Sequence, residues 1–303
     1  MRTMRAVVTF LLLFIISFAA AQGAAKTFEK KFSVAPGGTL TLKTDVGSVA
    51  ITGTDSKEVF VSANVRGRQR DVDEFDITAK QNAGGVEVNG TGQRSRRWFS
   101  WGGNDLDVQF TVHVPREYNV QLQTAGGDIS ITNVNGKANG GTSGGDISLT
   151  DIKGAVDLET SGGTIRAQRV EGIVHMETSG GDIRISDLKG DVDVHTSGGN
   201  ITLTTMEGKI RAETSGGNIT MKVRELNKGI VAETSGGDID IVLPKTITAN
   251  LNASTSGGEV TCDLPVTMSG KFDESRIRGT INGGGNTIQA HTSGGDIRIR
   301  AAE

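Results

Sequence analysis

Aliphatic and polar residues alternate along short segments of this 303-residue chain, and the alternation recurs at regular intervals. In the segment Thr178 to His195, TSGGDIRISDLKGDVDVH, a polar residue separates Ile183 from Ile185 and Val192 from Val194. A period of two predicts strands with one buried face, because successive side chains of a strand point to opposite sides. The segment therefore predicts one lap of chain with two strands.

Each lap is marked by a corner with the sequence Thr-Ser-Gly-Gly or Thr-Ala-Gly-Gly. Six corners follow one another at intervals of 18 residues, and the later ones are further apart, which indicates insertions. The corners begin at Thr124, Thr142, Thr160, Thr178, Thr196, Thr214, Thr234, Thr255 and Thr292, and Asn282-Gly283-Gly284-Gly285 is expected to be a degenerate corner. Such a period is typical of repeat architectures, whose units pack only on their neighbours.

Aliphatic residues occupy the same phase in successive laps. The two columns are Ile129, Ile147, Ile165, Ile183, Ile201 and Ile219, and Val156, Val174, Val192 and Ile210. A single lap has no partner for its two apolar stripes, so laps must stack with parallel strands in register, about 4.8 Å apart. The sequence predicts an all-β fold, a parallel β-solenoid with coils of about 18 residues. A sandwich of antiparallel hairpins is the alternative, but it does not require identical phase in every lap.

Two turns close each lap. Asp187-Leu188-Lys189-Gly190 is predicted to form one and Ser197-Gly198-Gly199 the other, with glycine adopting positive φ. Because Thr196 shares the phase of Val192 and Val194, we expect the corner threonines to point inward. Their hydroxyl groups would then form an internal ladder that satisfies backbone polar groups.

The first residues predict export. Met1-Arg2-Thr3-Met4-Arg5 precedes an apolar run from Ala6 to Ala20, and Ala19-Ala20-Ala21 has the small residues of a cleavage site. Residues 1–21 are therefore predicted to be a signal peptide. No second apolar run of that length follows, so we expect no transmembrane span in the mature chain. The expected location is the periplasm, the outer surface or the extracellular space.

Two further regions follow the predicted signal peptide. Residues 22–120 keep the alternation without the strict repeat and are predicted to be a β-rich cap with degenerate coils; Thr44 to Ile51, TDVGSVAI, resembles a worn corner followed by a strand. Residues 121–303 are predicted to be the solenoid repeats. A stack needs atypical end units, because an uncovered lap exposes both core and strand edge.

Composition narrows the function classes. The chain has 43 glycines, 4 prolines and one cysteine, Cys262, which cannot form an intramolecular disulfide and is expected to be a buried thiol. A net charge of −3 with mixed signs gives no basic surface for nucleic acid, so a nucleic-acid partner is not expected.

Three stretches carry a resemblance to a known family: FSVAPGGTLTLKTDVGSVAITG, HVPREYNVQLQTAGGDISI, and the repeated TSGGDI. The chain resembles the bacterial putative-adhesin family of β-strand repeats, a domain of unknown function related to autotransporter adhesin head domains. The resemblance covers nearly the whole mature chain. It implies an all-β solenoid at the cell envelope without an established reaction.

Aspartates follow the corner glycines in several laps, at Asp128, Asp146, Asp182, Asp238 and Asp296. Stacked carboxylates would repel one another, so a calcium-binding β-roll is one interpretation. The other is that these side chains accept turn hydrogen bonds, which the Asn and Thr found in the same column favour. The nonapeptide spacing of calcium rolls is absent.

Carboxylates also line the outward positions of the second strand, with Asp157, Glu159, Glu177, Asp193, Glu213 and Glu233 beside His175, His195 and Arg211. Such a face resembles that of carbohydrate-active β-helix enzymes. Glycoside cleavage, however, needs two carboxylates at a defined separation in a cleft. These residues occur in every lap, which favours a solvated face, and no catalytic, cofactor or metal residues are predicted.

The segment Arg94 to Gly103, RSRRWFSWGG, holds both tryptophans beside three arginines. It is predicted to be a loop between two strands. It could plug one end of the solenoid, or it could bind a sugar or an anionic surface through Arg94, Arg96, Arg97, Trp98, Phe99 and Trp101.

Together these patterns predict a non-catalytic exported envelope protein, an adhesin or interaction scaffold. Its expected partner is an envelope protein or glycan of unknown identity. A carbohydrate-active enzyme, a calcium-binding β-roll and an ice-surface binder are the alternatives; the last would need flat, outward threonine columns.

Overall fold

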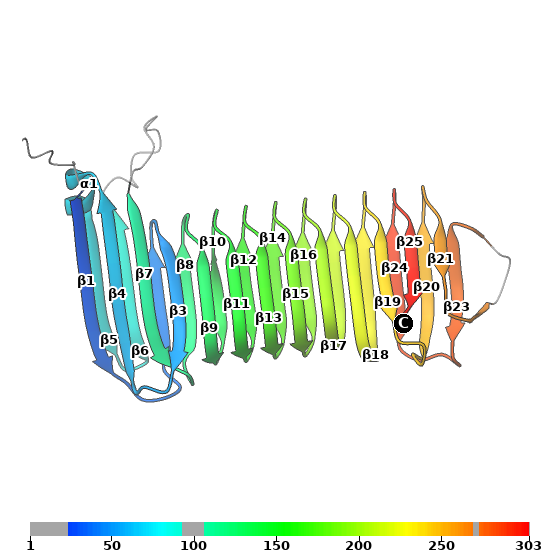
Figure 1. The fold of residues 1–303 in the computed structure, drawn as a ribbon, viewed down its shortest axis with the longest axis horizontal. Helices are drawn as coiled ribbons and strands as arrows, with labels where there is room; N and C mark the ends of the chain where they lie inside the picture. The colour runs from blue at the N-terminus through cyan, green and yellow to red at the C-terminus, as the bar shows by residue number, and fades with distance from the viewer. Residues whose placement is uncertain (1–23, 93–105, 269–272, 303) are drawn as a thin grey trace, which may run out of the picture.

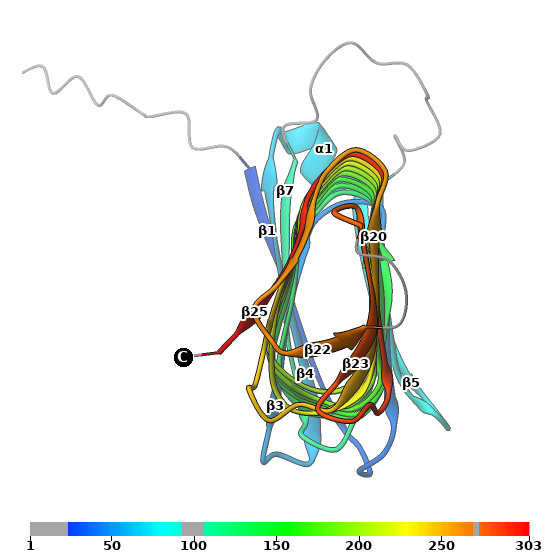
Figure 2. The same cartoon turned by 90° about the vertical axis from the view of Figure 1, so that its right-hand side faces the viewer.

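The computed structural model describes residues 24–92, 106–268 and 273–302. Strand dominates these residues, and one short helix, α1 (Gln69–Glu74), is present among them. The chain winds into an elongated stack of flattened coils (Figure 1), and the view along the stack shows two broad sheets facing each other (Figure 2). The predicted all-β class is confirmed.

One broad side, which we call sheet 1, begins each time after a corner. Its repeat strands are β9 (Ile129–Asn135), β11 (Ile147–Lys153), β13 (Ile165–Glu171), β15 (Ile183–Lys189), β19 (Ile239–Leu243), β25 (Ile297–Ala301) and β21 (Val260–Cys262). Sheet 2 is the opposite side, and its strands end at a corner threonine. They are β8 (Asn119–Thr124), β10 (Ala138–Thr142), β12 (Val156–Thr160), β14 (Val174–Thr178), β16 (Val192–Thr196), β24 (Thr287–Thr292) and β20 (Ala249–Thr255). Strands β17 (Ile201–Thr214) and β18 (Ile219–Thr234) run through both sheets.

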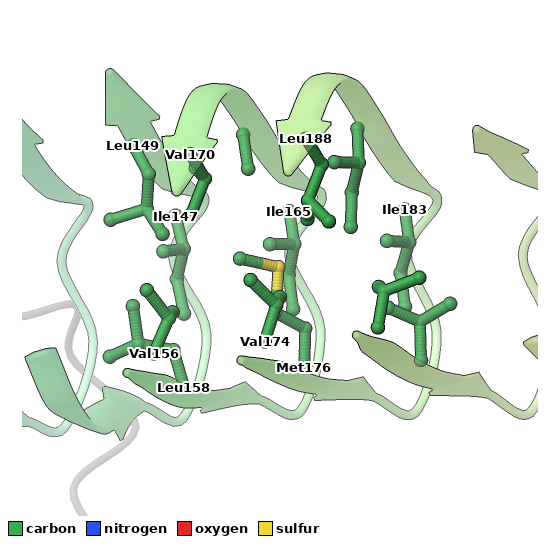
Figure 3. Packing of buried hydrophobic residues seen from close by; sticks show 14 of the residues in the cluster. Ile147, Leu149, Val156, Leu158, Ile165, Val170, Val174, Met176, Ile183 and Leu188 are labelled. Atoms are coloured by element: carbon green, nitrogen blue, oxygen red, sulfur yellow. The ribbon is translucent and has the colours of Figure 1, made fainter. Parts of the chain in front are cut away.

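Neighbouring coils pair in parallel, with like residues opposite one another. Ile147 pairs with Ile165 and Ile165 with Ile183, and from β8 to β17 the paired residues are 18 positions apart. Figure 3 shows these isoleucines in a row, facing the valines of sheet 2 across the interior. All three are 0 % exposed. The core is therefore a set of aliphatic ladders, as the phase of the sequence predicts.

The corner threonines point inward, which confirms the prediction. Thr178 is fully buried, and its Oγ1 donates a hydrogen bond of 2.9 Å to the carbonyl oxygen of Gly163 in the preceding coil. The same oxygen accepts the N–H of Gly181 at 3.3 Å. The equivalent contacts recur from Thr142 to Thr292, so each hydroxyl ties its own corner to the one below.

The turn opposite the corner differs from the prediction. Asp187 does not open a free turn: it has a φ of 55° and bends strand β15, which stays paired as far as Lys189. Only Gly190, with a φ of 140°, has the left-handed conformation expected of a turn glycine. At the corner, the φ of Gly198 and Gly199 lies outside the left-handed region, so positive φ does not explain those glycines.

The N-terminal region continues both sheets and closes the stack. Strands β1 (Ala24–Ser33), β4 (Glu58–Gly67), β7 (Asp107–Pro115) and β3 (Ser48–Thr54) extend sheet 1, and β5 (Phe75–Asn82), β6 (Gly85–Gly92) and β2 (Thr39–Thr44) extend sheet 2. The outermost pairs are antiparallel. From β1, Lys26 and Lys30 donate hydrogen bonds to carbonyl oxygens of β5 at 2.9 and 2.7 Å, which joins the two edge strands across the end.

Two coils do not stack in chain order. The coil of β2 and β3 lies between those of β6–β7 and β8–β9, and the predicted worn corner is confirmed because Thr44 pairs with Thr124. At the other end, β24 and β25 lie between the coil of β18–β19 and that of β20–β21. The long intervals before Thr255 and Thr292 therefore reflect this rearrangement as well as insertion.

The C-terminal end of the stack is closed by antiparallel pairing. Strand β23 (Arg276–Ile281) pairs with β20 and with β22 (Val266–Met268). The expected degenerate corner at Asn282 to Gly285 is instead the connection between β23 and β24, with φ near 88° at Gly283 and Gly284. That expectation was wrong, because glycine repetition alone does not distinguish a corner from a reversal of the chain.

Candidate functional site

The outward side of sheet 2 carries a group of charged side chains in which carboxylates outnumber the cationic groups. Six carboxylates project from β12 to β18, beside two histidines and one arginine. We call this group the acidic surface; it comprises Asp157, Glu159, His175, Glu177, Asp193, His195, Arg211, Glu213 and Glu233.

Strand register places these side chains in two columns. Asp157, His175, Asp193 and Arg211 stand opposite one another in sequence, and so do the glutamates with His195 in the second column. The rows are separated by the strand spacing of about 4.8 Å. Inward positions of the same strands hold the aliphatic ladders, so the rigid core fixes the spacing of the charges.

Few of the carboxylates are neutralised within the described chain. Arg211 contacts Glu213 and lies 3.9 Å from Asp193, which is also 4.0 Å from His175 Nδ1. Glu159 and Glu177 stand opposite each other on neighbouring strands, and neither forms an ion pair with a described residue. Like charges directly opposite one another destabilise a sheet. The acidic surface therefore lowers stability unless a cation or cationic group covers it.

Sheet 1 offers a contrast, because several of its outward arginines contact carboxylates. Arg166 contacts Asp146 at 2.8 Å, and Arg298 contacts Asp238 and Asp296 at 3.2 and 2.7 Å. Serine and threonine fill many of the remaining outward positions on this side. Sheet 1 is thus internally balanced, whereas sheet 2 is not.

The aspartates of the corner form a hydrogen-bonded column. Asp182 Oδ1 accepts the backbone N–H of Asn200 in the next coil at 2.8 Å, and Asp146 Oδ1 accepts that of Thr164. The backbone bond from Asn200 is the main reason that the pKa of Asp182 lies below its ordinary range, and the Arg166 guanidinium does the same for Asp146. No group of three His, Cys, Asp or Glu side chains among the described residues is placed to hold a metal ion. The geometry favours the turn-bonding interpretation over the calcium interpretation.

The remaining predicted positions are distributed as follows. Arg94, Arg96, Arg97, Trp98, Phe99 and Trp101, and the predicted signal peptide 1–21, lie outside the described residues. Cys262 is half-buried, its Sγ lies 3.6 Å from the carbonyl oxygen of Leu264, and burial raises the pKa of its thiol. His113, which belongs to no predicted site, stacks on Phe60 in sheet 1, with 6.0 Å between ring centroids, and does not join the acidic surface.

Sequence reasoning missed part of the sheet 2 surface. Gln121 and Asn139 stand below Asp157 in the first column, and Gln123 and Gly141 stand below Glu159 in the second. The repeat interval could have identified these residues, because they precede Asp157 and Glu159 by one or two intervals of 18. These residues carry no charge, so a pattern of charged side chains does not include them.

Comparison with known proteins defines the class. The family model Toastrack DUF4097 matches residues 38–300, and the chain belongs to that family. No curated protein matches the chain. None of the described helices is long and apolar enough to cross a membrane.

Similar solved structures exist at low identity. A "putative adhesin" from Bacteroides fragilis is 13 % identical, with 91 % of this chain and 97 % of that chain covered and a TM-score of 0.38. A "putative lipid binding protein" from Parabacteroides distasonis is 11 % identical, with 93 % and 98 % covered and a TM-score of 0.36. A "putative cell adhesion protein" from Clostridium sporogenes is 15 % identical, with 91 % and 100 % covered and a TM-score of 0.23.

Proposed function

We propose that the protein is a non-catalytic, exported interaction scaffold of the adhesin type, which holds a cationic partner of the cell envelope along the acidic surface. The observation that supports this most is the unbalanced charge of sheet 2 beside the balanced charge of sheet 1. In this proposal the coil of about 18 residues is the unit that repeats the charges at a fixed spacing.

A scaffold explains the arrangement better than an enzyme does. The carboxylates repeat along an open side. Glu159 and Glu177 line a depression, but both side chains are exposed, whereas acid-base catalysis on a glycoside requires a carboxyl group whose pKa is raised by burial. A rigid row of like charges instead suits a partner whose cationic groups are spaced along a surface, because many weak contacts then act together. The predicted signal peptide supports export.

The test compares capture by the mature chain and by two variants. The sheet 2 variant carries Asp157→Asn, Glu159→Gln, Glu177→Gln and Asp193→Asn. The matched sheet 1 variant carries Ser148→Ala, Thr150→Ala, Thr202→Ala and Thr204→Ala. Each immobilised protein is incubated with solubilised envelope fractions at low and high salt.

We expect the wild-type chain and the sheet 1 variant to retain the same molecules, and the sheet 2 variant to lose them. High salt should release them, because screening weakens exposed charge contacts. Equal capture by all three proteins would contradict the proposal. Release of reducing sugar ends from polysaccharides by the purified chain would contradict the non-catalytic assignment.

A further inference from the structure

Strand β10 departs from its neighbours in sheet 2. Its sequence is ANGGT, where the next three coils have VDLET, VHMET and VDVHT. Gly140 takes the place of an inward Leu or Met, and Gly141 takes the outward place held by Glu159 in the next coil. The second column of the surface therefore lacks one side chain, at the end where the carboxylates begin.

The backbone explains why only glycine fits. Gly140 has a φ of +130°, and a Cβ there would lie 1.7 Å from the carbonyl oxygen of Leu122. A Cβ at Gly141 would lie 2.3 Å from the carbonyl oxygen of Glu159 and 2.7 Å from its Cγ. Consecutive glycines weaken a strand, and here they allow the backbones of the neighbouring strands to approach closely and leave the outward position of Gly141 without a side chain.

A depression of about 370 Å³ opens over these glycines. Its volume lies within the range of small-molecule sites, about 300–1,000 Å³. Its rim is polar: it includes the carboxamides of Gln123 and Asn139, the carboxylates of Glu159 and Glu177, the hydroxyls of Ser143 and Ser161, and, on the side of β2, the ammonium group of Lys43. These groups come from several consecutive coils, so the ladder of the solenoid holds them in place.

The rim chemistry selects a class of ligand. Carboxamides and hydroxyls both donate and accept, which suits a molecule with many hydroxyl groups. Two carboxylates on adjacent strands, without an ion pair among the described residues, add a preference for an ammonium group. No aromatic residue lines the depression among the described residues, so recognition depends on hydrogen bonds and charge and not on ring stacking.

We propose that this depression binds an amino sugar, with Glu159 and Glu177 accepting hydrogen bonds from its ammonium group and the carboxamides and serines contacting its hydroxyls. The inference rests on the proposed function and deepens it: the cationic partner of the acidic surface is an amino-sugar-bearing glycan, and this is its end subsite.

The probe is the β-1,4-linked disaccharide of glucosamine, titrated into the mature chain at pH 6 and followed by calorimetry and by amide chemical shifts. The N-acetylated disaccharide, which lacks the positive charge, is titrated in parallel. The test variant is Glu159→Gln with Glu177→Gln. Its matched control is Glu58→Gln with Glu117→Gln, the same change at two exposed glutamates outside both the acidic surface and the depression. Both variants should fold, because the test variant removes a repulsion between facing carboxylates and the control changes exposed side chains.

We expect the amine disaccharide to bind, the test variant to raise its Kd at least tenfold, and the control to change it less than twofold. Shifted amides should cluster on β10 and β12. Absence of binding, equal loss in both variants, or equal affinity for the N-acetylated disaccharide would overturn the inference. If envelope capture still depends on sheet 2 while the disaccharide does not bind, the proposed amino-sugar subsite is wrong and the proposed scaffold function is still supported. If capture is independent of sheet 2, the proposed function fails.

Discussion

The two glycines of each corner have the same place in the repeat but different structural roles, and substitution by alanine separates them. A Cβ at Gly181 would lie 1.9 Å from the carbonyl oxygen of Gly163 in the coil below and 2.4 Å from its carbon. A Cβ at Gly180 would meet nothing closer than 3.7 Å. The φ of neither residue lies in the left-handed region, so the comparison isolates the close approach of backbones.

The magnitude follows from the geometry. A carbon and a carbonyl oxygen in contact are separated by about 3.3 Å, so Gly181→Ala must move the two backbones apart by about 1.4 Å. The hydrogen bond of 3.1 Å from Gly180 N to Ser161 O, and that of 2.9 Å from Thr178 Oγ1 to Gly163 O, could not both survive such a shift. Overpacking costs about 1–3 kcal/mol and each lost hydrogen bond about 1 kcal/mol, so we expect a loss of about 3–5 kcal/mol.

The assay is thermal unfolding of the mature chain followed by circular dichroism. At about 2 °C per kcal/mol for a chain of this size, Gly181→Ala should lower the Tm by about 6–10 °C. Gly180→Ala should leave it unchanged or raise it by 1–2 °C, since alanine restricts the unfolded chain. Amide exchange should locate the damage in the coils of β13 and β15. Equal melting temperatures for the two variants would refute the argument that coils contact each other through the second glycine.

Three further predictions test other parts of the scaffold. Thr178→Val, which keeps the shape but leaves the Gly163 carbonyl without its hydroxyl donor, should cost about 1–3 kcal/mol in denaturant unfolding, and Thr178→Ser should restore most of it. The hydrogen bond from Asn200 N lowers the pKa of Asp182 in the folded protein. The stability that this bond adds is therefore complete above the ordinary carboxyl pKa, and it is lost as the pH falls through the lowered pKa. Asp182→Asn, which keeps an acceptor but does not titrate, should therefore reduce the acid-dependent loss of Tm, and an unchanged profile would argue against this bond. Deletion of residues 286–303 removes a coil from the interior of the stack, so it should destabilise the protein far more than removal of an end coil would. A Tm within 5 °C of that of the wild-type chain would instead show that β20 and β21 can pair directly with β18 and β19.

The candidate site shows how far sequence reasoning extends. The acidic residues of sheet 2 were found from their phase, because a period of two assigns each side chain to one side of a strand. Their significance depended on contacts between coils: Arg166 and Arg298 contact carboxylates, whereas Glu159 and Glu177 stand opposite each other without an ion pair among the described residues. Such pairing cannot be read from a single lap.

The sequence by itself determined the ladder. Aliphatic residues recur at the same position of each lap, and parallel stacking of the laps buries Ile147, Ile165 and Ile183 together. The same alternation places the corner threonines in the interior. Only the tertiary structure decided which coils are neighbours at the two ends, because strands with the same pattern can pair equally well with several partners. It also decided why the second corner glycine is needed: the reason is the carbonyl of the coil below, a contact with a residue 18 positions away that no local conformational preference reveals.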